Sequence, residues 1–186
     1  ERRIKEIEND KEFYLNITKK INGPILEIGV GTLRIALFLA KHGINIWGID
    51  ASSAMLRMAK KKLRMCPRIV KKRLKIIKAD MLNFDLKRKF PLIIVPSRVF
   101  NHVSTFRGQK GVLLNFKKHL RNDGILILDL LPVNTYLKYP KTPKCVERFN
   151  HKNNNLIHCF ARRTFLNRKR QTFGIELDFK KAINQK

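Results

Sequence analysis

The sequence is poor in acidic residues and rich in basic ones. It has 14 Asp and Glu residues against 41 Lys and Arg residues, a formal net charge of +27 over 186 residues. A charge surplus of this size attracts polyanions, so RNA or another polyanion is one expected partner. Heat adaptation explains the surplus poorly, because it usually adds Glu together with Lys. A bias toward Lys at tolerant surface positions is the alternative explanation.

Cysteines and long apolar runs are also scarce. Cys66, Cys145 and Cys159 form no CxxC pair, and the His residues show no ligand spacing. We therefore predict free thiols, no metal site and a cytoplasmic, reducing location. No apolar run approaches the roughly 18 to 20 residues of a membrane helix, so we expect no membrane span. The first residue is Glu1 and the segment after it is charged and helical, so we see no signal peptide. Because no Met begins the sequence, we expect a trimmed or partial chain.

Apolar residues follow strand-like and helical spacing in turn along the first 135 residues. Strands are predicted at 25–28, 44–49, 74–79, 90–95 and 125–131, and helices at 3–20, 32–42, 52–66 and 106–120, with a turn at 122–124. This alternation predicts an α/β, Rossmann-like fold of three layers, in which helices cover both faces of a parallel sheet. We expect residues 1–135 to form this core.

The pattern changes after Pro132. Segments 156–165 and 171–179 read as two strands joined at 167–170, which predicts an antiparallel hairpin appended to the sheet. We expect residues 136–186 to extend the same domain and to act as a lid over a substrate.

Glycines and acids mark the ends of the first three predicted strands. Gly29 and Gly31 lie where the first strand turns into a helix, a place where a Cβ would obstruct a tight turn and keep a ligand from the backbone. Glu27 lies within the first strand, Asp50 ends the second, and Asp80 follows the third. Because ligands of α/β proteins bind at the carboxyl edge of the sheet, this combination predicts a nucleotide-like cofactor.

The identity of the cofactor follows from what a dinucleotide site would need. A dinucleotide fingerprint has a glycine at position 34, where this sequence has Arg34. Glu27 and Asp80 are not part of that fingerprint. Both fit a small cationic sulfonium cofactor better, because its ammonium group is attracted to a carboxylate.

An ordered set of motifs supports this choice. The chain reads LEIGVGTLRIALFLA, GIDASSAML, ADM, PSRVFNHV and LRNDGILILDL in that order. These segments resemble the class I S-adenosylmethionine-dependent methyltransferases, whose soluble domains usually have LELGCGTGRIALPLA, GxDxSxxML, ADM, PxxxFxHL and LxxGGxLxLDL. The resemblance covers about residues 10 to 135 and implies S-adenosyl-L-methionine as cofactor and methyl transfer as activity.

The resemblance also implies roles for individual residues. Glu27 and the Gly29–Gly31 backbone would hold the amino-acid moiety, with Tyr14 and Arg34 flanking the cofactor. The other implied cofactor-binding residues are Asp50 at the ribose, Ala51 and Met55 beside the adenosine, Asp80 and Met81 at the adenine, and Pro96 and Ser97 at the floor of the methyl-donor site.

The chain departs from the family pattern in two places. Leu33 replaces the family's third glycine, and its side chain is expected to narrow the site or weaken cofactor binding. A non-catalytic domain that binds RNA or protein is therefore one alternative. The family also usually continues past the hairpin through another helix and a final strand pair, whereas this sequence stops at Lys186, so we expect either a partial sequence or a shortened protein.

The acceptor is less well defined by the sequence. His102 is the best candidate for a general base and Asn101 could hydrogen-bond an acceptor, but both are weak catalytic candidates. Segment 95–98 lacks the Asn/Asp-Pro-Pro-Tyr/Phe motif typical of base N-methylation, which argues against that reaction. The resemblance itself implies a small-molecule acceptor. Basic clusters at Arg57 to Lys75 and Arg162 to Arg170 instead favour RNA or a ribonucleoprotein.

Overall fold

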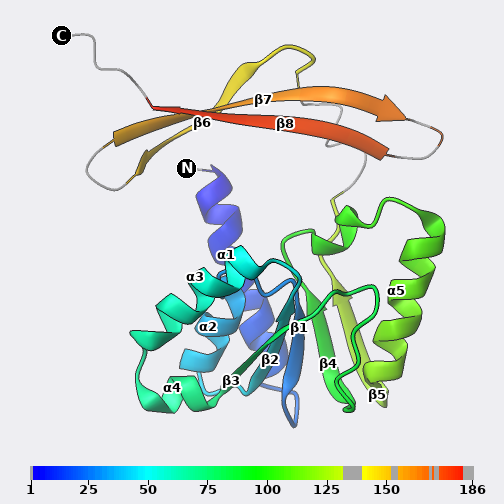
Figure 1. Ribbon diagram of the computed structural model, residues 1–186. Coiled ribbons are helices and arrows are strands. Elements are labelled where there is room, and N and C mark those ends of the chain that lie inside the picture. Colours follow the sequence, from blue (N-terminus) through cyan, green and yellow to red (C-terminus); the bar gives the residue numbers. More distant parts are fainter. Residues whose placement is uncertain (1, 132–139, 152–154, 168, 170–171, 182–186) are drawn as a thin grey trace. The chain divides into compact units, whose positions relative to one another are not determined.

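The computed structural model describes residues 2–131, 140–151, 155–167, 169 and 172–181. The chain forms two compact units, Glu1–Leu130 and Leu131–Lys186 (Figure 1). No helix in the described residues is both long enough and apolar enough to span a bilayer.

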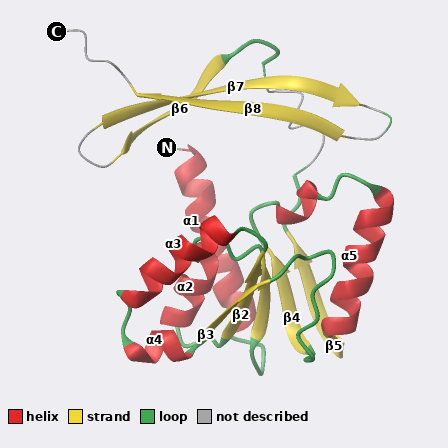
Figure 2. Cartoon of the chain, in the orientation of Figure 1, coloured by secondary structure: helices red, strands yellow, loops and turns green. Residues whose placement is uncertain are grey.

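The first unit is built on a five-stranded sheet. Its strands are β1 (Ile25–Ile28), β2 (Ile46–Asp50), β3 (Leu74–Lys78), β4 (Phe90–Val95) and β5 (Leu120–Leu128). They pair in the order β3-β2-β1-β4-β5, and every pair is parallel. The predicted parallel Rossmann-like sheet is therefore confirmed (Figure 2).

Helices connect these strands and lie on both faces of the sheet (Figures 1 and 2). They are α1 (Arg2–Thr18), α2 (Arg34–Lys41), α3 (Ser53–Arg64), α4 (Arg68–Lys72), the 3-10 helix η1 (Val99–His102) and α5 (Phe106–His119). Side-chain hydroxyls cap the N-termini of two of these helices. Ser52 accepts the Met55 N–H at 3.3 Å, and Thr105 accepts the Gly108 N–H at 3.1 Å.

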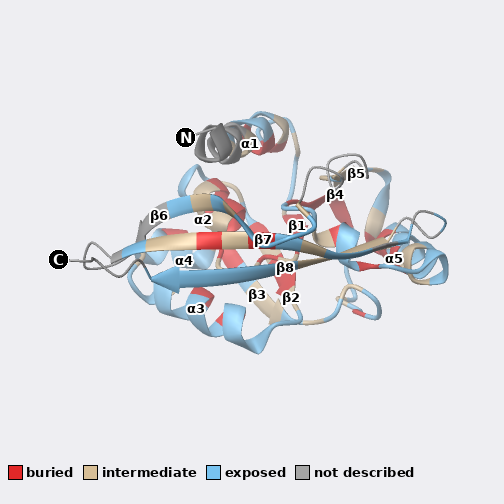
Figure 3. Cartoon of the chain, turned by 90° about the horizontal axis from the view of Figure 1, so that it is seen from above, coloured by how far each residue is buried: buried red, intermediate tan, exposed pale blue. Residues whose placement is uncertain are grey.

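Alternation along the central strands divides the core into two layers. Leu92 and Ile94 face the cluster that contains residues of α1 to α4, while Ile93 and Val95 face the cluster that contains Phe116 of α5. Buried residues concentrate in the strands and on the inner faces of the helices (Figure 3). The predicted three-layer arrangement is thus confirmed.

Three details of the first unit differ from the prediction. The short helices α4 and η1 were not predicted, because four or five residues are too few to show a helical period. The turn expected at 122–124 lies inside β5 instead. A register shift between Phe90 and Leu92 in the β4–β5 pairing accommodates these residues, so the strand begins earlier than its apolar run.

The second unit is a three-stranded antiparallel sheet of β6 (Lys144–His151), β7 (Asn155–Asn167) and β8 (Thr172–Lys181), in the order β6-β7-β8. The predicted hairpin corresponds to β7 and β8, but these strands belong to a separate sheet and are not appended to the parallel one. Strand β6 was missed because its sequence KCVERFNH does not alternate cleanly. In the basic cluster at 162–170, Arg162 is paired with Glu176 across the sheet at 2.6 Å, and positions 168 and 170 lie outside the described residues.

Candidate functional site

The loop between β1 and α2 depends on glycine at two positions. Gly29 has φ 71° and Gly31 has φ 52°, conformations that side chains disfavour. A Cβ at Gly29 would also lie 2.5 Å from a methyl group of Val99. The N–H groups of Gly29 and Val30 both donate to the Ile49 carbonyl, at 2.9 and 3.0 Å, which fixes the loop against the end of β2.

Hydrogen bonds to Asp50 link the segments that follow β1, β2 and β3. Its Oδ2 accepts the Gly31 N–H at 2.8 Å, and its Oδ1 accepts the Ser52 N–H at 2.7 Å. Its own carbonyl accepts the Ala79 N–H at 3.1 Å, next to Asp80. Each carboxylate oxygen can accept further hydrogen bonds, so Asp50 is held in place and still able to bind a ligand hydroxyl.

Glu27 is a buried carboxyl group in the middle of the sheet. Its residue exposure is 2%, and its Oε2 has no hydrogen-bond partner within the described part of the chain. Burial raises the pKa of Glu27 from 4.5 to about 8, although nearby Arg34 and a backbone hydrogen bond from Ala36 oppose the shift. An unpaired buried carboxyl oxygen is costly, so this position favours a cationic or hydrogen-bonding ligand.

Arg34 joins three segments at the start of α2. Its guanidinium donates to both carboxylate oxygens of Asp10 in α1, at 2.7 Å each, and to the Ser97 hydroxyl at 2.8 Å. The hydrogen bond to Asp10 raises the pKa of Arg34 further, so the side chain stays charged. A bidentate pair of this kind fixes the guanidinium plane and holds α1 against the loop after β4.

Two acids of this site were missed by sequence reasoning. Asp10 lies in α1, and Asp129 follows β5 with its N–H bonded to the Val95 carbonyl at 3.1 Å. Burial raises the pKa of the Tyr14 hydroxyl, and the negative charges of Asp129, Asp10 and Glu27 raise it further. Both acids therefore lie close enough to act on Tyr14. The strand-end rule that identified Asp50 could have identified Asp129, whereas Asp10 has no such signal.

Leu33 takes the backbone conformation of the glycine it replaces. It has φ 70° and ψ 34°, the left-handed region, immediately before α2. Its side chain is 1% exposed and belongs to the core cluster that contains Leu15 and Leu39. A side chain that narrowed an open binding site would be exposed to it, so the burial of Leu33 argues against the expected narrowing of the site. The expected loss of cofactor affinity stays a prediction.

The remaining predicted site residues lie on loops at the same edge of the sheet. Ala51 is exposed, Met55 is 45% exposed in the first turn of α3, and Met81 is partly buried. The exposed Asp80 accepts the Leu82 N–H on its Oδ1 at 2.9 Å. Their positions follow the carboxyl ends of β2 and β3, as predicted.

The loop after β4 is strained. Pro96 is buried, and the next two residues, Ser97 and Arg98, have φ 57° and 62°. The 3-10 helix η1 follows and presents Asn101 and His102 on the surface. Both weak catalytic candidates are therefore accessible at the carboxyl edge of the sheet.

Together, the glycine loop and the acids at successive strand ends define a nucleotide-type cofactor site in a Rossmann-like fold. Comparison with known proteins agrees with this class. The family described as a methyltransferase domain matches residues 26–126, more than half of the chain. The chain therefore belongs to the methyltransferase domain family, of the class that uses S-adenosylmethionine.

Individual relatives are more distant. A glycine/sarcosine N-methyltransferase of Parasynechococcus marenigrum (strain WH8102) is 26% identical over 125 residues, which is 66% of this chain and 43% of that protein. The chain thus matches less than half the length of this curated relative.

Solved structures share the fold. The CcbJ methyltransferase from Streptomyces caelestis has a TM-score of 0.71 at 20% identity, covering 92% of this chain and 70% of its own. The glycopeptide N-methyltransferase MtfA in complex with S-adenosyl-L-methionine has a TM-score of 0.64 at 16% identity, covering 90% and 75%.

Proposed function

We propose that this chain binds S-adenosyl-L-methionine at the carboxyl edge of its parallel sheet and transfers the methyl group to a small-molecule acceptor. The unpaired Oε2 of buried Glu27 carries this proposal. Such an oxygen is costly unless a ligand supplies a partner, and the ammonium group of the cofactor supplies both a hydrogen-bond donor and a positive charge.

Residues at the ends of β1, β2 and β3 would hold the cofactor. Glu27 and the backbone of the glycine loop would hold its amino-acid part. Asp50, already fixed by the Gly31 and Ser52 N–H groups, would accept the ribose hydroxyls. Asp80 and Met81 would lie at the adenine. Arg34, fixed by both carboxylate oxygens of Asp10, would keep the loop after β4 in place through Ser97, while its positive charge still acts on Glu27.

Methyl transfer requires little chemical activation by the protein itself. The bound cofactor supplies a methyl group that is already activated by the positive sulfonium. The chain's own task is to hold an acceptor in line behind that methyl group and to exclude water. A general base is needed only for an acceptor that keeps its proton at the working pH, and His102 is the accessible candidate.

The small-molecule acceptor is supported by the names of similar proteins. These include a glycine/sarcosine N-methyltransferase and an amino pentose methyltransferase from Micromonospora echinaspora. An RNA or ribonucleoprotein acceptor and a non-catalytic domain are the alternatives. That the antiparallel sheet covers the acceptor stays a prediction. So does a reducing, cytoplasmic location, which the free cysteines would require.

Calorimetric titration tests cofactor binding. We expect saturable binding of S-adenosyl-L-methionine and of its demethylated product, and at least a tenfold loss of affinity for the former in Glu27→Gln. Asp123→Asn, which neutralises an exposed acid in β5, is the matched control and should bind as the native chain does. A chain that binds neither compound refutes the proposal and favours the non-catalytic alternative.

Release of the demethylated product tests the acceptor class. It is measured in separate reactions with pools of small amines and hydroxyl compounds and with total RNA. Turnover with a small-molecule pool supports the proposal. Turnover with RNA alone would contradict the small-molecule acceptor and show that the enzyme methylates RNA.

A further inference from the structure

A basic pocket lies at the edge of the sheet opposite the cofactor site. Its volume is about 370 Å³, and Trp47, Lys72, Arg73, Lys75 and Arg88 are among its lining residues. β2 begins at Ile46, next to this pocket, and ends at Asp50. Because the sheet is parallel, the amino ends of β2 and β3 form this edge, about 15 Å from the carboxyl ends.

Trp47 organises the charges in this pocket. The Lys75 ammonium lies 3.6 Å from the centroid of the indole ring, and the Arg88 guanidinium carbon lies 5.5 Å from it. Cation–π contacts of this kind hold two flexible side chains beside one half-buried ring. Trp47 also packs edge-on against buried Phe90, at 5.6 Å between ring centroids, so the ring is firmly placed.

The four cations have no acidic partner. Arg73 donates to the Gly43 carbonyl at 2.7 Å, and none of the ion pairs found in the described residues includes any of the four. Like charges in one concavity repel each other and focus a positive potential there. An anion that enters the pocket therefore relieves repulsion as well as forming new contacts.

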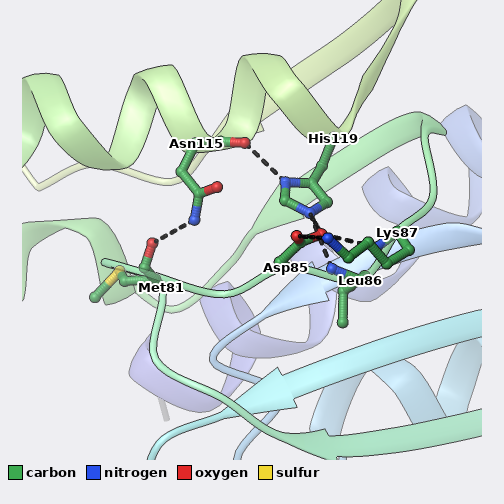
Figure 4. Close-up of polar contacts among 6 residues, drawn as sticks. All are labelled: Met81, Asp85, Leu86, Lys87, Asn115 and His119. Atoms are coloured by element: carbon green, nitrogen blue, oxygen red, sulfur yellow. Dashed lines mark hydrogen bonds and ion pairs between the residues drawn. The ribbon is translucent and has the colours of Figure 1, made fainter.

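A second pocket continues the basic surface. It has a volume of about 790 Å³, and Arg88 lines it together with Lys87, Lys89 and Lys118. Here one charge is already neutralised, because Lys87 pairs with Asp85 at 2.6 Å (Figure 4). The wall is rigid: buried His119 bonds the Asn115 carbonyl at 2.9 Å and accepts the Leu86 N–H at 3.1 Å.

The shared Arg88 thus places two hollows side by side. The last residue of α4, Lys72, lines the smaller pocket, and the same short helix also carries Arg68 and Lys71. The basic surface is therefore longer than one phosphate group needs, and its centre is concave. A flat lipid surface does not reach the cations inside a hollow, whereas the phosphates of a flexible strand do.

We propose that this surface, from α4 through the Trp47 pocket to Lys118, binds the sugar-phosphate backbone of a single-stranded nucleic acid. The inference is independent of the methyl acceptor, because the two sites lie at opposite edges of the sheet. Lys75 and Arg88 both lie over the Trp47 ring, so the ring contacts cations and does not serve as a stacking platform for a base, and binding should follow charge and not sequence.

Trp47 is the only tryptophan of the chain, so its fluorescence reports on this pocket directly. The full chain is titrated with a short labelled single-stranded oligonucleotide, with anisotropy and tryptophan emission recorded together. We expect both signals to saturate at the same concentration. The four cations of the Trp47 pocket alone predict a slope of about −3 in log affinity against log salt, and contacts along the rest of the surface should make it steeper.

Two charge-reversal variants locate the site. Arg88→Glu should weaken binding about tenfold and flatten the salt slope by about one unit. Arg107→Glu makes the same charge change at an exposed position in the first turn of α5 and should weaken binding less than threefold. S-adenosyl-L-methionine affinity should be unchanged in both variants, which separates failure of this site from failure of the proposed function.

Competitors decide between sources of phosphate. Tripolyphosphate should compete only weakly, and phosphatidylglycerol vesicles should not alter Trp47 emission. The proposal is overturned if the two variants bind equally, if tryptophan emission does not respond, or if vesicles or tripolyphosphate bind as tightly as the oligonucleotide.

Discussion

At position 33 we expect the glycine variant to be more stable than the alanine variant, the reverse of their usual order of stability. Leu33 is 1% exposed and has φ 70°. Truncation of a buried leucine to alanine typically costs about 2–5 kcal/mol. L33A keeps the left-handed backbone of a residue with a Cβ, which costs about 1–2 kcal/mol, whereas L33G removes that strain.

The two variants lose nearly the same buried surface, so the strain decides between them. Glycine also increases the entropy of the unfolded chain, which normally makes it about 0.5–1 kcal/mol less stable than alanine. After this entropy term is subtracted from the relieved strain, L33G should be more stable than L33A by up to about 1 kcal/mol. Both should be less stable than the native chain.

Urea unfolding followed by circular dichroism measures the difference. Leu39 is the matched control, because it is fully buried in the middle of α2. There the order should be the usual one, with L39A more stable than L39G by about 1 kcal/mol. If L33G proves less stable than L33A by the same margin as at Leu39, the left-handed strain at position 33 is absent and the reasoning fails.

Other substitutions test the charges and the close packing of the site. Glu27→Gln should stabilise the free chain, because burial raises the pKa of the Glu27 carboxyl in the folded state only. The gain in free energy of unfolding should be absent below the ordinary pKa of 4.5, grow as pH rises to about 8 and stay constant above it. A gain that shrinks as pH rises would contradict this. Gly29→Ala should cost about 2 kcal/mol more than Gly43→Ala in urea unfolding, since both have positive φ but only the former meets Val99; equal costs would show that Val99 can move. Arg34→Lys should lower the free energy of unfolding by about 1 kcal/mol, because a lysine cannot make the bidentate contact; an unchanged urea midpoint would show that the contact contributes nothing.

Much of the fold was predictable because its signals are local. Apolar strands such as Phe90–Val95 are buried on both faces, and the glycine loop after β1 lies at a fixed point of the strand–helix alternation. The acids that end strands could be placed at one edge from the parallel topology alone. Asp50 is the clearest example, since its neighbours Gly31 and Ser52 also follow strand ends.

The features that were missed depend on contacts between distant segments. The Asp10–Arg34 pair joins residues 24 positions apart and has no signature in either helix. Leu33 is buried in a cluster that also contains Tyr14 and Leu15 of α1, far away in sequence, so the sequence indicated only a missing glycine. The basic pocket was visible as charge, but its position around Trp47 required the parallel pairing of β2 with β3.

The most direct test of the account is the affinity of the Asp50→Ala variant for S-adenosyl-L-methionine, measured by titration calorimetry beside Asp123→Ala, with thermal unfolding to show that both are folded. The account predicts that loss of Asp50 weakens binding at least tenfold, because the ribose loses its acceptor and the Gly31 N–H loses its anchor, while Asp123→Ala binds as the native chain does. Equal affinity in the two folded variants would show that the strand-end acid does not hold the cofactor and would contradict the site as described.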